Sequence, residues 1–167
     1  LLLVISGCGA NNSTDDTTEA ISLNQVGEYS GAPYVYLNNN MPYFTDEEKE
    51  NTKPFENYSS LDDLGRCGVA FANIYKELMP TEERGPIGQI KPSGWHTVKY
   101  NGIIDGNYLY NRCHLIGYQL TGENANELNL ITGTRYLNTE GMEGFENTVG
   151  DYVAEMENHV VWEDTKL

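Results

Sequence analysis

Hydrophobic positions repeat with two periods along the chain, which predicts several short strands and one long helix. Apolar residues that alternate or run together predict strands at 34–37, within 66–78, at 95–100, in the stretch leading into His114, and at 159–162. From Met142 to Met156 they recur every three or four positions, as in an amphipathic helix. The spacing of Ser60 and Asp63 predicts a capping box and a helical turn that ends at Gly65. We therefore expect an α+β domain.

The two ends of the chain differ from its middle. Residues 1–7 are apolar with small residues at their end, which predicts part of a lipoprotein signal peptide, with a lipid attached to Cys8. Residues 8–24 hold few apolar side chains and predict a flexible tether. Residues 25–167 are then the folded domain. The strand at 159–162 has no evident partner, which predicts that the C-terminal strands of this domain are missing.

Acidic residues dominate the composition, but not everywhere. The chain has 10 Lys and Arg against 25 Asp and Glu, a net charge of −15. Residues 84–135 hold five basic and three acidic residues, so the remaining chain carries −17. Cations on phosphates provide most non-specific affinity for nucleic acids. A substrate of that class would therefore bind modestly here and would depend on a metal ion.

The polar residues between 111 and 146 form a set that suits phosphodiester hydrolysis. Arg112 and His114 are two positions apart, which places them on one side of an extended strand. A neutral imidazole takes a proton from water, and a guanidinium holds phosphate oxygens. Asn138 is expected to be the N-cap of the long helix, and Glu146 follows eight residues later. Amide and carboxylate oxygens are ligands of hard divalent cations.

Each member of this set also has a purely structural interpretation, such as a buried core histidine, a turn asparagine or a surface helix acid. Cys67 and Cys113 also have two interpretations: they form a disulfide, or they are two small buried apolar residues. The His and Cys residues lack the paired spacing of a structural zinc site.

The segment resembles the DNA/RNA non-specific endonuclease family, which has the ββα-metal fold. The family's Asp-Arg-Gly-His motif is similar to residues 111–114, and its segment that ends in the metal-binding Asn is similar to residues 129–138. The Glu eight positions later corresponds to Glu146. The similarity extends over roughly residues 28–160 and is greatest to streptococcal-type secreted deoxyribonucleases and DNA-entry nucleases.

This resemblance implies a central antiparallel or mixed sheet with the metal-site helix packed on it. It implies His114 as the general base that activates water. Asn138 would be the direct protein ligand of Mg²⁺, with Mn²⁺ as an alternative metal. Glu146 would hold the waters of that ion.

The resemblance also implies phosphate contacts from Arg112 and Arg84, and support of the metal site or the His loop by Asn129. Three positions depart from the family pattern. Asn111 and Cys113 replace the Asp and the Gly of the motif, and Gly150 stands where some members carry a phosphate-binding Arg.

The expected function is an extracellular, metal-dependent endonuclease that hydrolyses DNA, with RNA left open as a second substrate. It would be anchored to a bacterial cell membrane through Cys8, or secreted, with no obligate protein partner. The alternative is a catalytically inactive surface lipoprotein that acts as a binding module on the same fold. The 12 Tyr residues and the acidic tether fit that alternative equally well.

Overall fold

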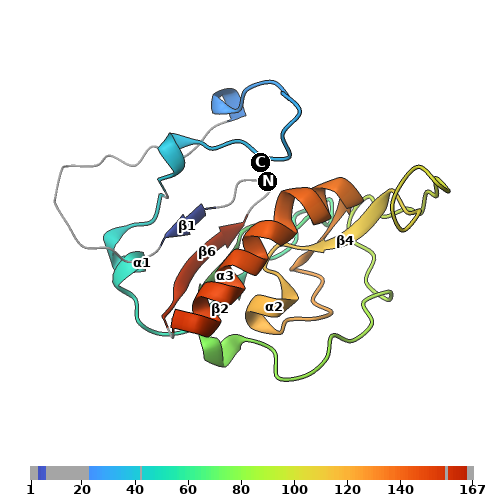
Figure 1. The fold of residues 1–167 in the computed structure, drawn as a ribbon. Coiled ribbons are helices and arrows are strands. Elements are labelled where there is room, and N and C mark those ends of the chain that lie inside the picture. The colour runs from blue at the N-terminus through green and yellow to red at the C-terminus, as the bar shows by residue number, and fades with distance from the viewer. Residues whose placement is uncertain (1–3, 7–22, 42, 157, 165–167) are drawn as a thin grey trace.

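The computed structural model describes residues 4–6, 23–41, 43–156 and 158–164. As expected, they form an α+β fold, in which a long helix accompanies two antiparallel sheets (Figure 1). The first sheet has the strand order β1-β6-β3-β2, and the second pairs β4 with β5. The strands are β1 (Val4–Ser6), β2 (Phe55–Tyr58), β3 (Ala70–Ile74), β4 (Tyr110–His114), β5 (Leu130–Thr134) and β6 (Val160–Asp164).

The long helix α3 (Glu143–Met156) directly follows a π-helical segment, η4 (Leu137–Met142). The remaining helical elements are short: η1 (Leu23–Gln25), η2 (Asn38–Asn40), α1 (Asp46–Glu50), η3 (Lys76–Leu78) and α2 (Tyr118–Thr121). Among the described residues, no helix combines the length and apolar character needed to cross a membrane.

The main core lies between α3 and the four-stranded sheet. Val149 and Val153 on the helix belong to one buried cluster with Ala72 and Trp162 on the sheet. This confirms the predicted amphipathic helix. The Trp162 indole Nε1–H also donates to the backbone oxygen of Leu115 at 3.2 Å, which joins the sheet to the chain just after β4.

The predicted strand at 159–162 is confirmed as β6, but the expectation that it lacks a partner is wrong. Trp162 of β6 lies opposite Ala72 of β3 on one side and opposite Ile5 of β1 on the other. Cys8, the predicted lipidation site, and most of the predicted tether lie outside the described residues.

Two predicted strands are absent because their alternating side chains contact something other than a sheet. Residues 34–37 are not a strand; the Tyr34 ring packs edge-on against Phe145 of α3, with centroids 4.8 Å apart. The stretch 95–100 contributes only one isolated bridge, between Lys99 and Tyr108. In both segments the apolar residues alternate, but the alternation does not reflect pairing in a sheet.

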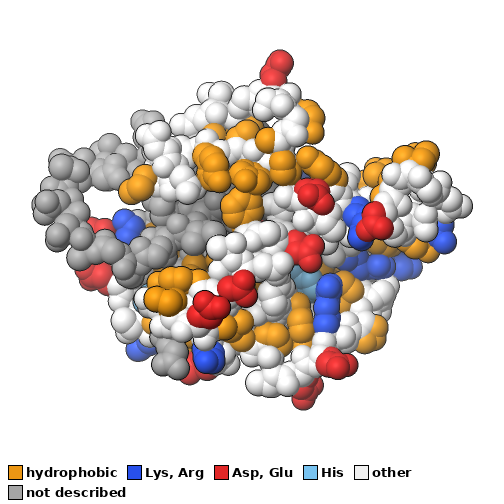
Figure 2. Space-filling view, viewed as in Figure 1, with side chains coloured by type: hydrophobic (Ala, Val, Ile, Leu, Met, Phe, Trp, Pro, Cys, Tyr) orange, Lys and Arg blue, Asp and Glu red, His pale blue; other side chains and the backbone are white. Residues whose placement is uncertain are grey.

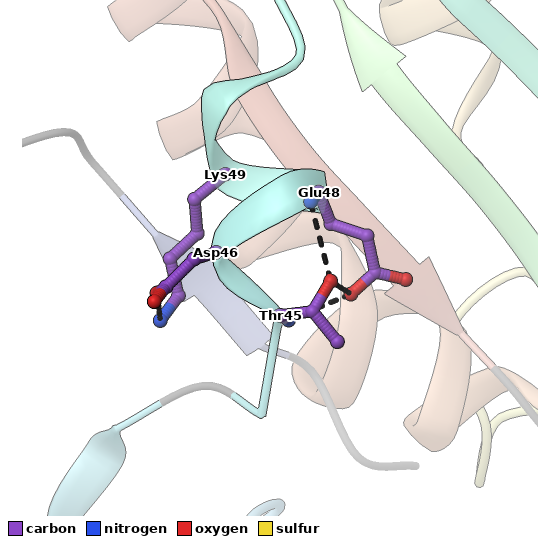
Figure 3. Close-up of polar contacts among 4 residues, drawn as sticks. All are labelled: Thr45, Asp46, Glu48 and Lys49. Atoms are coloured by element: carbon purple, nitrogen blue, oxygen red, sulfur yellow. Dashed lines mark hydrogen bonds and ion pairs between the residues drawn. The ribbon is translucent and has the colours of Figure 1, made fainter. Parts of the chain in front are cut away.

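The capping prediction was also misplaced. Residues 60–65 form a turn in which the Asp62 carboxylate accepts from the backbone N–H of Leu64 and Arg66. As predicted, Gly65 ends this segment, with a left-handed φ of 69°. The capping box lies instead at Thr45 and Glu48, where it begins the short helix α1 (Figure 3).

Candidate active site

His114 is the last residue of β4, and both of its ring nitrogens are engaged. The side chain is 6% exposed. Nε2 lies 2.8 Å from the backbone oxygen of Asn124, and Nδ1 lies 3.3 Å from the Arg84 guanidinium. A carbonyl only accepts and a guanidinium only donates, so the compatible tautomer carries its proton on Nε2 and its lone pair on Nδ1.

The surroundings of His114 keep the ring neutral. Burial lowers its pKa below the usual 6.5, and the positive charge of Arg84 lowers it further, while the hydrogen bond to Asn124 acts in the opposite direction. At neutral pH the ring is therefore neutral, and its Nδ1 lone pair accepts a hydrogen bond from Arg84.

The two candidate phosphate-binding arginines have different positions. Arg84 contacts His114 from the long connection after β3. Arg112 instead donates to the backbone oxygens of Ile90 and Gly88, and its guanidinium lies 3.7 Å from the ring centroid of Trp95. Arg112 thus anchors the Pro- and Gly-rich connection, residues 79–95, to β4. Strand periodicity alone did not reveal this contact.

Asn129 fixes the backbone that leaves β4. It is fully buried. Its amide Nδ2–H donates to the backbone oxygen of Ile116 at 3.0 Å, and its Oδ1 accepts from the Ile116 N–H at 2.8 Å. Its backbone oxygen accepts from Leu115 N–H at 2.9 Å. These bonds hold the two residues after His114.

Asn138 lies within the π-helical segment, so the expectation that it is an N-cap is wrong. Tyr136 already has helical backbone angles, and the hydroxyl of Thr134 accepts from the backbone N–H of Leu137 at 3.0 Å. The Asn138 backbone oxygen accepts from the N–H of Glu143, five residues later. The Asn138 side chain makes no hydrogen bond to another described residue.

The π turn places Asn138 and Glu146 on the same face of the helix. In a regular α-helix, residues eight positions apart differ by about 80° around the axis. A π turn accommodates one additional residue. With one residue absorbed by the π turn, Asn138 and Glu146 are related as residues seven positions apart in a regular α-helix. Such residues differ by only about 20° around the helix axis after two turns.

Glu146 points into the gap between α3 and α2. The Gln119 side-chain N–H donates to its Oε2 at 2.9 Å. A Cβ added at Gly117 would lie 2.8 Å from the Glu146 carboxyl carbon, so only glycine leaves room for this carboxylate. Burial raises the pKa of Glu146 to about 7; nearby Glu143 adds to the rise, while Gln119 and Arg84 oppose it.

The oxygen donors on this helix face suit a hard divalent cation. Asn138 offers an amide that makes no hydrogen bond to another described residue, and Glu146 offers a buried carboxylate whose pKa is raised. In the described residues, no group of three or more His, Cys, Asp and Glu side chains could hold a metal ion. A metal bound here would therefore keep most of its water ligands, as Mg²⁺ commonly does.

Two of the departures from the family pattern, Cys113 and Gly150, have local explanations. A Cβ at Gly133 would lie 2.6 Å from the Cys113 Sγ, so the glycine on β5 makes space for the thiol on β4. Gly150 is buried, and a Cβ there would contact Leu120 of α2 at 3.7 Å, so its helix face meets α2 rather than a substrate.

Cys67 and Cys113 are both buried thiols, and burial raises the pKa of Cys113 to about 12.

The sequence prediction missed three residues of this site. Asn124 acts on His114 through its backbone, so no side-chain pattern reports it. Gln119 and Gly117 act on Glu146 from α2 and its N-cap position, an element of four residues that is too short to show helical periodicity. The only available signal was their closeness in sequence to His114.

Comparison with known proteins places this site in context. The family model for DNA/RNA non-specific endonuclease matches residues 44–164. No curated protein matches the chain significantly. Three solved structures have similar folds. NucA from Streptococcus agalactiae with magnesium bound is 24% identical, with a TM-score of 0.61 over 70% of this chain and 58% of that chain.

The metal-free structure of NucA from Streptococcus agalactiae is 23% identical, with a TM-score of 0.58, and the match covers 72% of this chain and 59% of that one. The Sda1 nuclease with a bound zinc ion is 25% identical, with a TM-score of 0.56, over 72% of this chain and 68% of that one. The match therefore spans somewhat less than two thirds of the length of NucA.

Proposed function

The chain belongs to the DNA/RNA non-specific endonuclease family, and on that premise we propose that it is a metal-dependent endonuclease that hydrolyses phosphodiester bonds of DNA and RNA. The observation that carries this proposal is the neutral, buried His114, whose Nδ1 faces Arg84, together with the buried Glu146 carboxylate, whose pKa the charge of the same guanidinium lowers. A binding module without catalytic activity has no need of this arrangement, and no observation favours that alternative.

In this proposal His114 is the general base. Its Nδ1 accepts a proton from the attacking water, and the backbone oxygen of Asn124 stabilises the resulting imidazolium through Nε2–H. Arg84 moves from Nδ1 to the non-bridging oxygens of the phosphate and so frees the lone pair. Arg112 contributes by holding residues 88–90 in place, and only its outer guanidinium edge remains for phosphate.

Asn138 would hold a single Mg²⁺ directly, and Glu146 would hold its water ligands; Mn²⁺ has the same preference for oxygen ligands. A bound divalent cation neutralises the phosphate and the leaving oxygen. Gln119 and Gly117 keep the Glu146 carboxylate in position for this role. The lipid anchor on Cys8 and an extracellular location remain part of the proposal, on the strength of the apolar start Ile5-Ser6-Gly7-Cys8. Membrane fractionation of the Cys8→Ser variant tests them.

Plasmid cleavage tests the activity. Purified chain is incubated with supercoiled plasmid in Mg²⁺ or in EDTA, as wild type, as His114→Ala and as the control Met156→Ala, whose side chain is 63% exposed at the far end of α3. We expect cleavage in Mg²⁺ only, a loss of roughly 100-fold or more in His114→Ala, and no change in Met156→Ala. Absence of cleavage by a chain that circular dichroism shows to be folded would contradict the proposal.

A further inference from the structure

Four exposed tyrosines gather where residues 23–41 run beside the start of the long helix. Tyr29 is 76% exposed, Tyr36 61%, Tyr136 47% and Tyr34 40%. We call this group the tyrosine surface. Figure 2 shows hydrophobic side chains, tyrosine included, gathered in the upper part of the view, over the region where this segment lies in Figure 1.

The tyrosine surface is held together by specific contacts. Tyr34 packs edge-on against Tyr36, with centroids 5.4 Å apart, and against Phe145 of α3 at 4.8 Å. The nearby Tyr29 hydroxyl raises the pKa of Tyr136. The ring contacts of Tyr34 attach the N-terminal segment to α3 at Phe145. Tyr34 and Tyr36 are therefore presented together as a packed pair of rings.

One of the two helical contact positions borders the candidate active site. Phe145 immediately precedes Glu146, and one position turns a helix by about 100°, so Phe145 lies on the flank next to Glu146. Tyr136 is two positions before Asn138 and points about 160° away from it. The tyrosine surface thus meets the flank of the Asn138 and Glu146 face at Phe145 and extends from there towards the opposite side of the helix.

The charges near this surface exclude phosphate as its ligand. Glu140 and Glu143 are exposed on the same helical stretch, and the chain as a whole carries −15. These acids repel phosphates and anionic lipid headgroups alike. The neutral faces of nucleobases experience no such repulsion, and they stack on aromatic rings whatever their sequence.

We propose that the tyrosine surface binds unpaired bases of the substrate by stacking, so that the enzyme favours single-stranded stretches of nucleic acid. The proposal rests on the proposed function, because it assigns the ligand to the flank of the same site. Bases inside a duplex cover each other's faces, whereas bases of a single strand are free to stack on Tyr29 and Tyr36. Stacking then supplies affinity that the acidic chain cannot obtain from phosphate contacts.

A comparison of two oligonucleotides distinguishes binding through bases from binding through phosphates. The full chain carrying His114→Ala, which prevents cleavage, is titrated into a fluorescent oligodeoxythymidylate and into an abasic oligomer with the same number of phosphates, and binding is followed by anisotropy. We expect the thymidylate to bind roughly tenfold more tightly, because one stacked base contributes that much. Tyr29→Ala and Tyr36→Ala, each added to His114→Ala, should remove most of this difference and leave abasic binding unchanged.

Matched variants make the result specific. Tyr36→Phe retains the ring and should bind as the parent does, and Met156→Ala removes an exposed apolar side chain at the other end of α3 and should also have no effect. Equal affinities for the two oligomers, or a preference that survives both tyrosine variants, would overturn the proposal. Metal-dependent plasmid cleavage is measured in parallel on chains that retain His114. Cleavage without base preference refutes only the stacking inference, and base preference without cleavage refutes only the proposed function.

Discussion

The backbone oxygen of Asn124 lies 2.8 Å from Nε2 of His114, and this contact determines which ring nitrogen can act as a base. The same asparagine packs its amide against Gly85, where a Cβ would lie 2.9 Å from Nδ2. Gly85 follows Arg84, the residue on the other ring nitrogen. One residue outside the predicted motif therefore orients the ring and limits where its cationic neighbour can lie.

The first prediction concerns pH. The folded-state pKa of His114 is lowered, so the neutral base persists below pH 6.5 and is lost only as the pH falls through this lower value. Cleavage in Mg²⁺ should therefore lose activity on the acid side at a midpoint below 6.5. In Arg84→Met the positive charge is removed, and the midpoint should move upward. The rate also falls in this variant because phosphate contacts are lost, so the midpoint and not the rate is the readout.

The His114 Cε1–H resonance provides an independent check of that midpoint. In the metal-free chain its NMR titration should give a pKa below 6.5 in wild type and a higher value in Arg84→Met. His96 is exposed, and Arg84→Met does not alter its hydrogen bond to the backbone oxygen of Gly94, so its resonance checks that the substitution acts locally. A His114 pKa above 6.5 in the wild type would contradict the assignment of a neutral base.

Asn129→Ala tests the support of the His loop. The substitution leaves the N–H and the carbonyl of Ile116 buried without their partner. We expect the free energy of unfolding to fall by about 3 kcal/mol. Cleavage by the remaining folded protein should also decrease. Asn57→Ala, at an exposed position of β2, should change stability by no more than about 0.5 kcal/mol. Equal effects of the two substitutions in urea denaturation would contradict this role.

Much of the fold follows from periodicity because the elements that form the core obey it. Strands β3 and β6 and helix α3 contribute Ala72, Trp162 and Val153 to one buried cluster, and each lies in a segment with the predicted period. Residues 34–37 show the limit of this reasoning. Tyr34 and Tyr36 alternate as in a strand, but Tyr34 packs on a helix and Tyr36 is 61% exposed. Periodicity reports which side chains are apolar and not which element covers them.

The candidate site was predictable where side-chain chemistry is specific. His114 lies 3.3 Å from the Arg84 guanidinium, and the charge of Arg84 acts on the pKa of both His114 and Glu146. Arg112 was expected to face substrate, but the carbonyls of Gly88 and Ile90 hold it, and such a loop contact has no periodic signature. The π turn at Asn138 was equally hidden, because it depends on the tertiary packing of the helix and not on propensity.

Gly117→Ala tests the space around the candidate metal site. The added methyl would meet the Glu146 carboxylate and the Gln119 amide oxygen, both of which are ends of flexible side chains. The fold should therefore survive while the carboxylate moves, and cleavage should fall by roughly tenfold or more. Gly144→Ala is the matched control, because nothing lies within 4 Å of its added methyl. It should leave cleavage intact and raise stability by up to about 1 kcal/mol. An active Gly117→Ala enzyme would argue against a role for the Glu146 position.

Glu146 should make the metal-free chain less stable at high pH. Its pKa is raised from 4.5 to about 7 on folding, so its contribution is fully present below pH 4.5 and is lost as the pH rises through about 7. The shift corresponds to about 3 kcal/mol once the group is ionised. Glu146→Gln removes the ionisation and should be more stable than wild type at pH 8 in EDTA. Thermal unfolding measures this difference, and saturating Mg²⁺ should reduce it. A wild type that is the more stable of the two in EDTA would contradict the raised pKa.

The π turn permits a prediction about helix phase. Deletion of exposed Glu140 should convert η4 into regular α-helix, and Asn138 and Glu146 would then be seven residues apart and still on one face. Insertion of one alanine after Gly144 should instead rotate Asn138 by about 100° relative to Glu146. Mn²⁺ binding, measured by electron paramagnetic resonance, should persist in the deletion and weaken strongly in the insertion, while circular dichroism confirms that both variants fold. If the deletion weakened Mn²⁺ binding as much as the insertion did, the wider geometry of the π turn itself, and not the shared helix face, would be what the metal requires.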